Sequence, residues 1–170
     1  HKTIQYVYEN TGEKIDFSKS NYDDPKVFQL ISSGDTEAIF QLESGGMKKL
    51  MKNLQPNCLE DIIAGISLFR PGPMDFIPAY LEGKKNAQNV KYKHPMLEDI
   101  LNTTYGCMVY QEQIMQIVRK LGGFTYAQAD NIRRAMGKKD KAVMKAQRDK
   151  FVHGETDENG NVLIKGAVRN

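Results

Sequence analysis

The sequence predicts a mainly α-helical protein, a multi-helix domain with a small β-hairpin near the C-terminus. Apolar residues recur at the i, i+3, i+4, i+7 spacing of one helix face over residues 114–121. Several other apolar stripes follow a residue that caps helix N-termini. Asn159-Gly160 stands between residues 155–157 and the apolar run 162–164, which is typical of a type I′ hairpin.

Composition indicates a globular protein of ordinary polarity. The 170 residues are 40% hydrophobic and 26% charged, and the net charge of +3 permits a phosphate-bearing partner without requiring one. No apolar run approaches the length of a membrane span, so no membrane partner is expected. Cys58 and Cys107 match neither a disulfide framework nor a zinc spacing, which favours a cytoplasmic location. Because the chain opens at His1 and ends without a closing element, we expect a piece of a longer protein.

The N-terminal third predicts three helices. Residues 2–10 form a short helix, and Asp24 caps a second helix that has proline in its first position and ends at Gly34. Residues 38–42 are expected to be briefly extended. Ser44 caps a third helix, whose lysines point outward and whose inward side carries Met47, Leu50, Met51 and Leu54.

A strongly apolar helix is expected over residues 58–69. Its inner stripe would consist of Leu59, Ile62, Ile63, Ile66 and Phe69. Arg70-Pro71-Gly72-Pro73 then ends it in a stiff corner, where Arg70 either caps the helix or contacts a ligand. We expect another helix over 75–82, a basic loop over 83–93 and a short helix over 95–101.

Two successive helices follow. In the first, Ile114, Ile117, Val118 and Leu121 line one face before Gly122-Gly123 ends it. Thr125 and Gln128 form a capping box at the start of the second. The apolar side of that helix would carry Ala129, Ile132 and Met136, while Arg133 and Arg134 point away from it.

Positive charge gathers after residue 132. Between Arg133 and Lys150 the chain has eight lysines or arginines and two aspartates. A helix break is favoured there, with Gly137 just past one helix and Asp140 as the next N-cap. A solvated face is the ordinary interpretation of such charge. The paired arginines weaken that interpretation, because a guanidinium can bind phosphate in a bidentate way.

Sequence motifs for catalysis are absent. There is no phosphate-binding loop of the Gly-x-x-x-x-Gly-Lys-Ser/Thr type, no Gly-x-Ser-x-Gly elbow and no His-Glu-x-x-His. The acidic pairs fall at expected helix starts or turns rather than on strands. We therefore assign no catalytic residue and no metal ligand within this chain.

Four sequence blocks stand in order between residues 40 and 139. The first is Phe40-Gln41-Leu42-Glu43-Ser44 with Gly46-Met47, and the second is Leu68-Phe69-Arg70-Pro71-Gly72-Pro73-Met74. The third is Tyr105-Gly106 with Tyr110-Gln111-Glu112-Gln113. The fourth runs from Ala129-Asp130 through Arg133-Arg134-Ala135-Met136-Gly137-Lys138-Lys139. Together these blocks resemble the C-family bacterial replicative DNA polymerase, the alpha subunit of DNA polymerase III.

The resemblance implies that residues 1–23 end the palm or connect to it, 24–153 form helical fingers, and 154–170 form a hairpin and tail. It implies deoxynucleoside triphosphate, template-primer DNA and the rest of the polymerase chain as partners. The family's fingers are helical and place basic residues on the triphosphate. The nucleotide-binding candidates are Arg133, Arg134, Lys138, Lys139 and Arg70.

The family's catalytic aspartates belong to the palm, outside this chain. The resemblance therefore implies no cofactor in this fragment and Mg²⁺ in the parent enzyme, a DNA-directed nucleotidyltransferase. Whether the fragment itself is an enzyme is left open. Two rival interpretations remain: a self-contained helical module that binds the DNA backbone, and a helical interaction domain whose charges are merely solvated.

Overall fold

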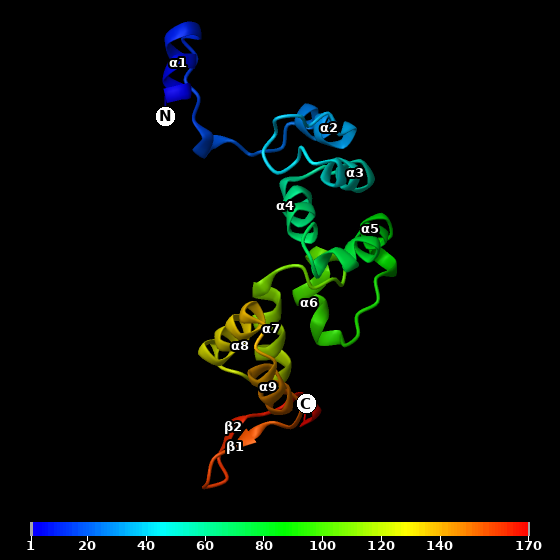
Figure 1. The fold of residues 1–170 in the computed structure, drawn as a ribbon, viewed down its shortest axis with the longest axis vertical. Coiled ribbons are helices and arrows are strands. Elements are labelled where there is room, and N and C mark those ends of the chain that lie inside the picture. Colours follow the sequence, from blue (N-terminus) through cyan, green and yellow to red (C-terminus); the bar gives the residue numbers. More distant parts are fainter. Residues whose placement is uncertain (1, 170) are drawn as a thin grey trace. The chain divides into compact units, whose positions relative to one another are not determined.

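The computed structural model describes residues 2–169 and confirms a mainly α-helical chain with one small hairpin (Figure 1). His1 and Asn170, the outer ends of the expected palm and tail segments, lie outside the described residues. The chain divides into two compact units, His1–Ile62 and Ile63–Asn170. Within the described residues, no helix is both long and apolar enough to cross a membrane.

In the first unit, α2 (Pro25–Ser33) and α3 (Gly45–Leu54) pack together, and α1 (Lys2–Thr11) buries none of its residues. The expected caps are confirmed, since the Asp24 side chain accepts a hydrogen bond from Lys26 N and the Ser44 side chain accepts one from Met47 N. Gly34 takes the left-handed conformation at the end of α2, with φ 74°. The packed residues are Phe28, Ile31, Met47, Leu50, Met51 and Leu54.

The extended segment expected over residues 38–42 is wrong, because this stretch folds into successive turns. Ala38 and Gln41 both have positive φ, of 60° and 66°. The hydroxyl of the fully buried Thr36 donates to Leu42 O at 2.6 Å and closes the loop. Local hydrogen bonding to a buried threonine thus overrides the extended preference of the apolar sequence.

The middle of the chain contains α4 (Leu59–Leu68), α5 (Ile77–Lys85) and α6 (Glu98–Leu101). The expected stripe on α4 is wrong in part, since Ala64 and Leu68 are buried whereas Leu59 and Ile63 are exposed. The corner after α4 is confirmed, and Gly72 there has a φ of 100°. The expected basic loop begins later than predicted, because α5 extends to Lys85.

The core of the second unit lies between α7 (Gln111–Gly122), α8 (Tyr126–Lys138) and α9 (Lys141–His153). On α7, Met115 and Val118 are buried. Of the residues predicted to line one face of this helix, Ile114, Ile117 and Leu121 are only half-buried. Met136 is 41% exposed, so its predicted place on the apolar side of α8 is wrong, and Ala135 takes that place. The central cluster consists of Met115, Val118, Phe124, Ala129, Ile132 and Ile164.

The break between α8 and α9 is confirmed, but its position differs from the prediction. α8 continues through Gly137, and Lys139 is the residue in the left-handed conformation, with φ 55°. Asp140 caps α9 by accepting hydrogen bonds from Ala142 N and Val143 N, each at 3.1 Å. Because the Asp140 cap sets where α9 begins, the turn falls on the residue directly before it.

The hairpin pairs β1 (Glu155–Thr156) with β2 (Val162–Ile164) in antiparallel register. The predicted type I′ turn is wrong, because only Gly160 has a positive φ, of 82°. Gly160 N donates to Asp157 O at 3.0 Å, and Asp157 N donates to Asn161 O at 2.9 Å. The Asp157 side chain also accepts from Asn159 N and Asn161 N, which favours this longer turn.

Gly166→Ala is expected to destabilise the chain far more than Gly160→Ala. Both glycines have φ near 80°, so alanine is strained at either site by about 1–2 kcal/mol. At Gly166 an added Cβ would also lie 2.4 Å from Gly154 N, a backbone clash that adds roughly 1–3 kcal/mol, whereas at Gly160 it meets open space. Thermal melting of both variants checks this, and equal losses would contradict the packing described here.

Candidate phosphate-binding site

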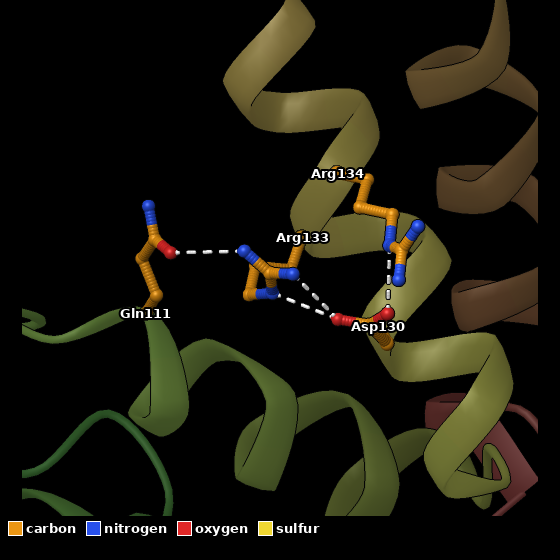
Figure 2. A network of polar contacts seen from close by, with 4 residues as sticks. All are labelled: Gln111, Asp130, Arg133 and Arg134. Atoms are coloured by element: carbon orange, nitrogen blue, oxygen red, sulfur yellow. Dashed lines mark hydrogen bonds and ion pairs between the residues drawn. The ribbon is translucent and has the colours of Figure 1, made fainter.

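The side chain of Asp130, in the second turn of α8, holds two neighbouring arginines (Figure 2). Arg133 Nε and Nη2 lie 2.8 Å from Asp130 Oδ1, and Arg134 Nε lies 2.8 Å from Oδ2. The spacings of three and four residues place all three side chains on neighbouring positions of one helix surface. One carboxylate therefore fixes the directions of both guanidinium groups.

The two arginines lower the pKa of Asp130 below its ordinary value of 3.8. The largest cause is the hydrogen bond from Arg133, followed by the one from Arg134. Asp130 is thus an anion at neutral pH. Because one carboxylate meets two guanidinium groups, the cluster keeps a net positive charge.

A second helix reaches the same cluster through Gln111, the first residue of α7. Its side-chain oxygen accepts a hydrogen bond from Arg133 Nη1 at 3.2 Å (Figure 2). The third and fourth sequence blocks, separated in the chain, meet at this contact. Arg133 therefore connects the start of α7 to the middle of α8.

The two arginines differ in how much of their hydrogen-bonding capacity is used. A guanidinium has five N–H donors, and Arg133 directs its Nε, Nη1 and Nη2 atoms to Asp130 and Gln111. Arg134 uses only Nε among the described residues, and its side chain is 66% exposed against 32% for Arg133. Both Nη groups of Arg134 remain available to a ligand.

The other basic candidates are exposed. Lys138 is the last residue of α8 and Lys139 caps it, and the described part of the chain gives neither side chain an ion pair. Arg70 lies in the corner after α4, and no hydrogen bond or ion pair among residues 2–169 joins it to the Asp130 cluster. The structure thus brings Arg133 and Arg134 together, leaves two lysines at the end of the same helix, and does not bring Arg70 to the cluster.

Comparison with known proteins shows the family of this chain. The sequence pattern of the bacterial DNA polymerase III alpha subunit finger domain matches residues 1–159. The chain belongs to this family.

Similar proteins include the DNA polymerase III subunit alpha of Staphylococcus aureus strain MRSA252, which is 48% identical over 160 residues. The corresponding subunit of Staphylococcus epidermidis is 49% identical over 154 residues. These alignments cover 94% and 91% of this chain but only 15% and 14% of the relatives. The chain therefore spans about one seventh of the length of the curated relatives it matches and corresponds to their fingers region.

Two members of the site in this fingers segment were not predicted from the sequence. Asp130 and Gln111 were visible only as parts of sequence blocks, although Asp130 precedes the two arginines at helical ion-pair spacings. Gln113 is buried, which its polar side chain does not suggest. Among the described residues, no group of three or more His, Cys, Asp or Glu side chains could hold a metal ion. The Mg²⁺ expected for the parent enzyme stays a prediction.

Asp130→Asn is expected to lower the melting temperature of the chain at neutral pH, by an amount that shrinks in acid. Because the folded-state pKa of Asp130 is lowered, its ionised form contributes stability above its ordinary pKa of 3.8. That contribution is lost as the pH falls through the lower folded-state pKa. Melting curves between about pH 3 and pH 8 measure the difference between wild type and variant.

Asp149→Asn is the matched control, since Asp149 is an exposed aspartate in a single ion pair with Arg148 at 3.5 Å. It makes the same change of charge but should shift the melting temperature less. If both variants melt alike at every pH, Asp130 does not organise the arginines.

Proposed function

We propose that this fingers segment binds the triphosphate of the incoming deoxynucleotide in the intact polymerase III alpha subunit. The supporting observation is the pair of unused Nη groups on Arg134, beside a carboxylate that fixes the Nε edge of the same guanidinium. A guanidinium so held can bind two phosphate oxygens without first losing side-chain freedom. Arg133, Lys138 and Lys139 add positive charge around it, and Arg70 is a further candidate from the corner after α4.

Such a site suits the chemistry proposed for the parent enzyme. Phosphoryl transfer depends mainly on positioning and on neutralising charge, so a helix bearing arginines can assist it without supplying a carboxylate. The palm of the parent enzyme would supply the aspartates and bind Mg²⁺. The segment is therefore proposed to bind nucleotide without catalysing polymerisation alone.

Template-primer DNA is the second proposed ligand. Lys141 and Lys145 are exposed on α9, which follows directly after the lysines that end α8. Contacts of lysine with DNA phosphates are spread out and individually weak, and they depend strongly on salt. We expect the DNA footprint to involve many basic groups and the nucleotide site to depend on few.

Arg134→Ala in the full-length alpha subunit is expected to weaken nucleotide incorporation by roughly 10- to 150-fold. A charge-assisted hydrogen bond contributes about 1.5–3 kcal/mol, and about 1.4 kcal/mol corresponds to tenfold. Arg134→Lys should restore only part of the loss, because an ammonium group lacks the planar fork. Steady-state kcat and KM for the nucleotide, with the Kd for primer-template DNA, measure the effect.

Arg148→Ala removes an exposed arginine from α9 and is the matched control for nucleotide kinetics. It should leave the nucleotide KM unchanged. If Arg134→Ala instead leaves nucleotide kinetics intact and greatly weakens DNA binding, the arginines contact the DNA backbone.

Primer extension by the isolated 170-residue chain is expected to be absent at any Mg²⁺ concentration, because the proposed catalytic aspartates belong to the palm. A radiolabelled primer assay with purified chain checks this, with the full-length subunit as the positive control. Incorporation that follows the chain through purification would overturn the proposed division between palm and fingers.

A further inference from the structure

A buried polar network lies under the start of α7 and involves the third sequence block. Gln113 is 5% exposed and Thr104 is fully buried. Gln113 Oε1 accepts hydrogen bonds from Val109 N at 2.9 Å and Tyr110 N at 3.0 Å. Gln113 Nε2 donates to Ile100 O at 3.2 Å and to Thr104 Oγ1 at 2.8 Å.

The four hydrogen-bond partners allow the side-chain amide of Gln113 only one orientation. The amide oxygen meets two N–H donors, and the amide nitrogen meets a carbonyl oxygen and a hydroxyl oxygen. A reversed amide would bring donors against donors and leave the buried carbonyl unpaired. Because every hydrogen bond is made inside the protein, the side chain has a single low-energy position.

The same network also holds residues 104–107, which precede α7, in place. The Thr104 hydroxyl accepts from Gln113 and donates to Cys107 O at 2.6 Å. Between these residues, Tyr105 and Gly106 both have positive φ, of 51° and 80°, which turns the chain sharply. An alanine Cβ at Gly106 would lie 3.1 Å from the Val90 side chain, so the turn is also closely packed.

The network and the basic cluster both involve the first turn of α7. Gln111 and Gln113 are the first and third residues of α7, and the hydrogen bonds of Gln113 to Tyr110 N and Val109 N prevent that turn from fraying. Gln111 is thereby held where its side-chain oxygen can accept from Arg133 Nη1. Arg133 shares Asp130 with Arg134, so hydrogen bonds and the backbone of the first turn of α7 connect the buried amide to the exposed guanidinium.

We propose that Gln113 is a positioning residue for the nucleotide site, acting with Thr104 through Gln111 on the arginine pair. This inference rests on the proposed function. In this proposal, the Tyr105-Gly106 and Tyr110–Gln113 segments serve to keep Arg133 and Arg134 correctly oriented. Neither Gln113 nor Thr104 touches the nucleotide in this account.

The test uses the full-length alpha subunit with two variants of different severity. Thr104→Val keeps the side-chain shape and removes the hydroxyl that accepts from Gln113. Gln113→Glu keeps the acceptor oxygen but removes the amide donors. Each variant is made alone and combined with Gln111→Ala, and Gln116→Ala, an exposed glutamine of the same helix, is the control.

Both variants should raise the nucleotide KM about 2- to 10-fold, the effect of one misplaced hydrogen bond. When Gln111 is already alanine, Thr104→Val or Gln113→Glu should raise the nucleotide KM by less than about a further 2-fold, because the hydrogen bond from Arg133 to Gln111 is already lost. The Kd for primer-template DNA and the Gln116→Ala control should stay unchanged. Thr104→Val remains informative if Gln113→Glu fails to fold.

The inference would be overturned if Thr104→Val and Gln113→Glu raised the nucleotide KM equally in the wild-type and Gln111→Ala backgrounds. The effect would then not depend on Gln111. A lower melting temperature with an unchanged KM would also overturn it, leaving a purely structural role. Arg134→Ala in the same assay separates the two proposals. If Arg134→Ala raises KM but Thr104→Val does not, only the positioning role fails, whereas an inert Arg134→Ala removes the nucleotide site itself.

Discussion

The carboxylate of Asp130 is the contact on which the basic site depends, because two guanidinium groups share it. Without that anion, two adjacent arginines would repel each other and sample many rotamers at a helix surface. With it, Arg133 points toward α7 and Arg134 keeps its outer edge free. One negative charge thus organises positive charge without cancelling it. The result is a cationic group that is oriented before any ligand arrives.

The helical scaffold serves the same end. α7 and α8 are joined by a tight turn, and their packed apolar faces place Gln111 close enough to accept from Arg133. The end of α8 is set by the Asp140 cap, which leaves Lys138 and Lys139 at a helix terminus where cations are electrostatically favoured. α8 therefore packs its apolar residues on one side and exposes positive charge on the other.

Local sequence signals predicted much of this fold, whereas contacts between distant residues escaped prediction. The caps of α2, α3, α8 and α9 follow from side chains next to the helix ends, so the sequence alone reveals them. The turn at residues 38–42 depends on buried Thr36, and the exposure of Met136 depends on which face of α8 meets the core. The arginines could be singled out from the sequence. Their sharing of Asp130 follows the helical spacing within α8, whereas the contact with Gln111 depends on the packing of α7 against α8.

A crystal structure of the full-length alpha subunit with primer-template DNA and an incoming nucleotide tests the central claim most directly. We expect the Nη groups of Arg134 to lie within about 3 Å of phosphate oxygens of the nucleotide while Nε stays on Asp130. Arg133 should still donate to Gln111 in the same complex. A complex in which Arg134 leaves Asp130 to contact the DNA backbone, with the triphosphate bound elsewhere, would contradict it.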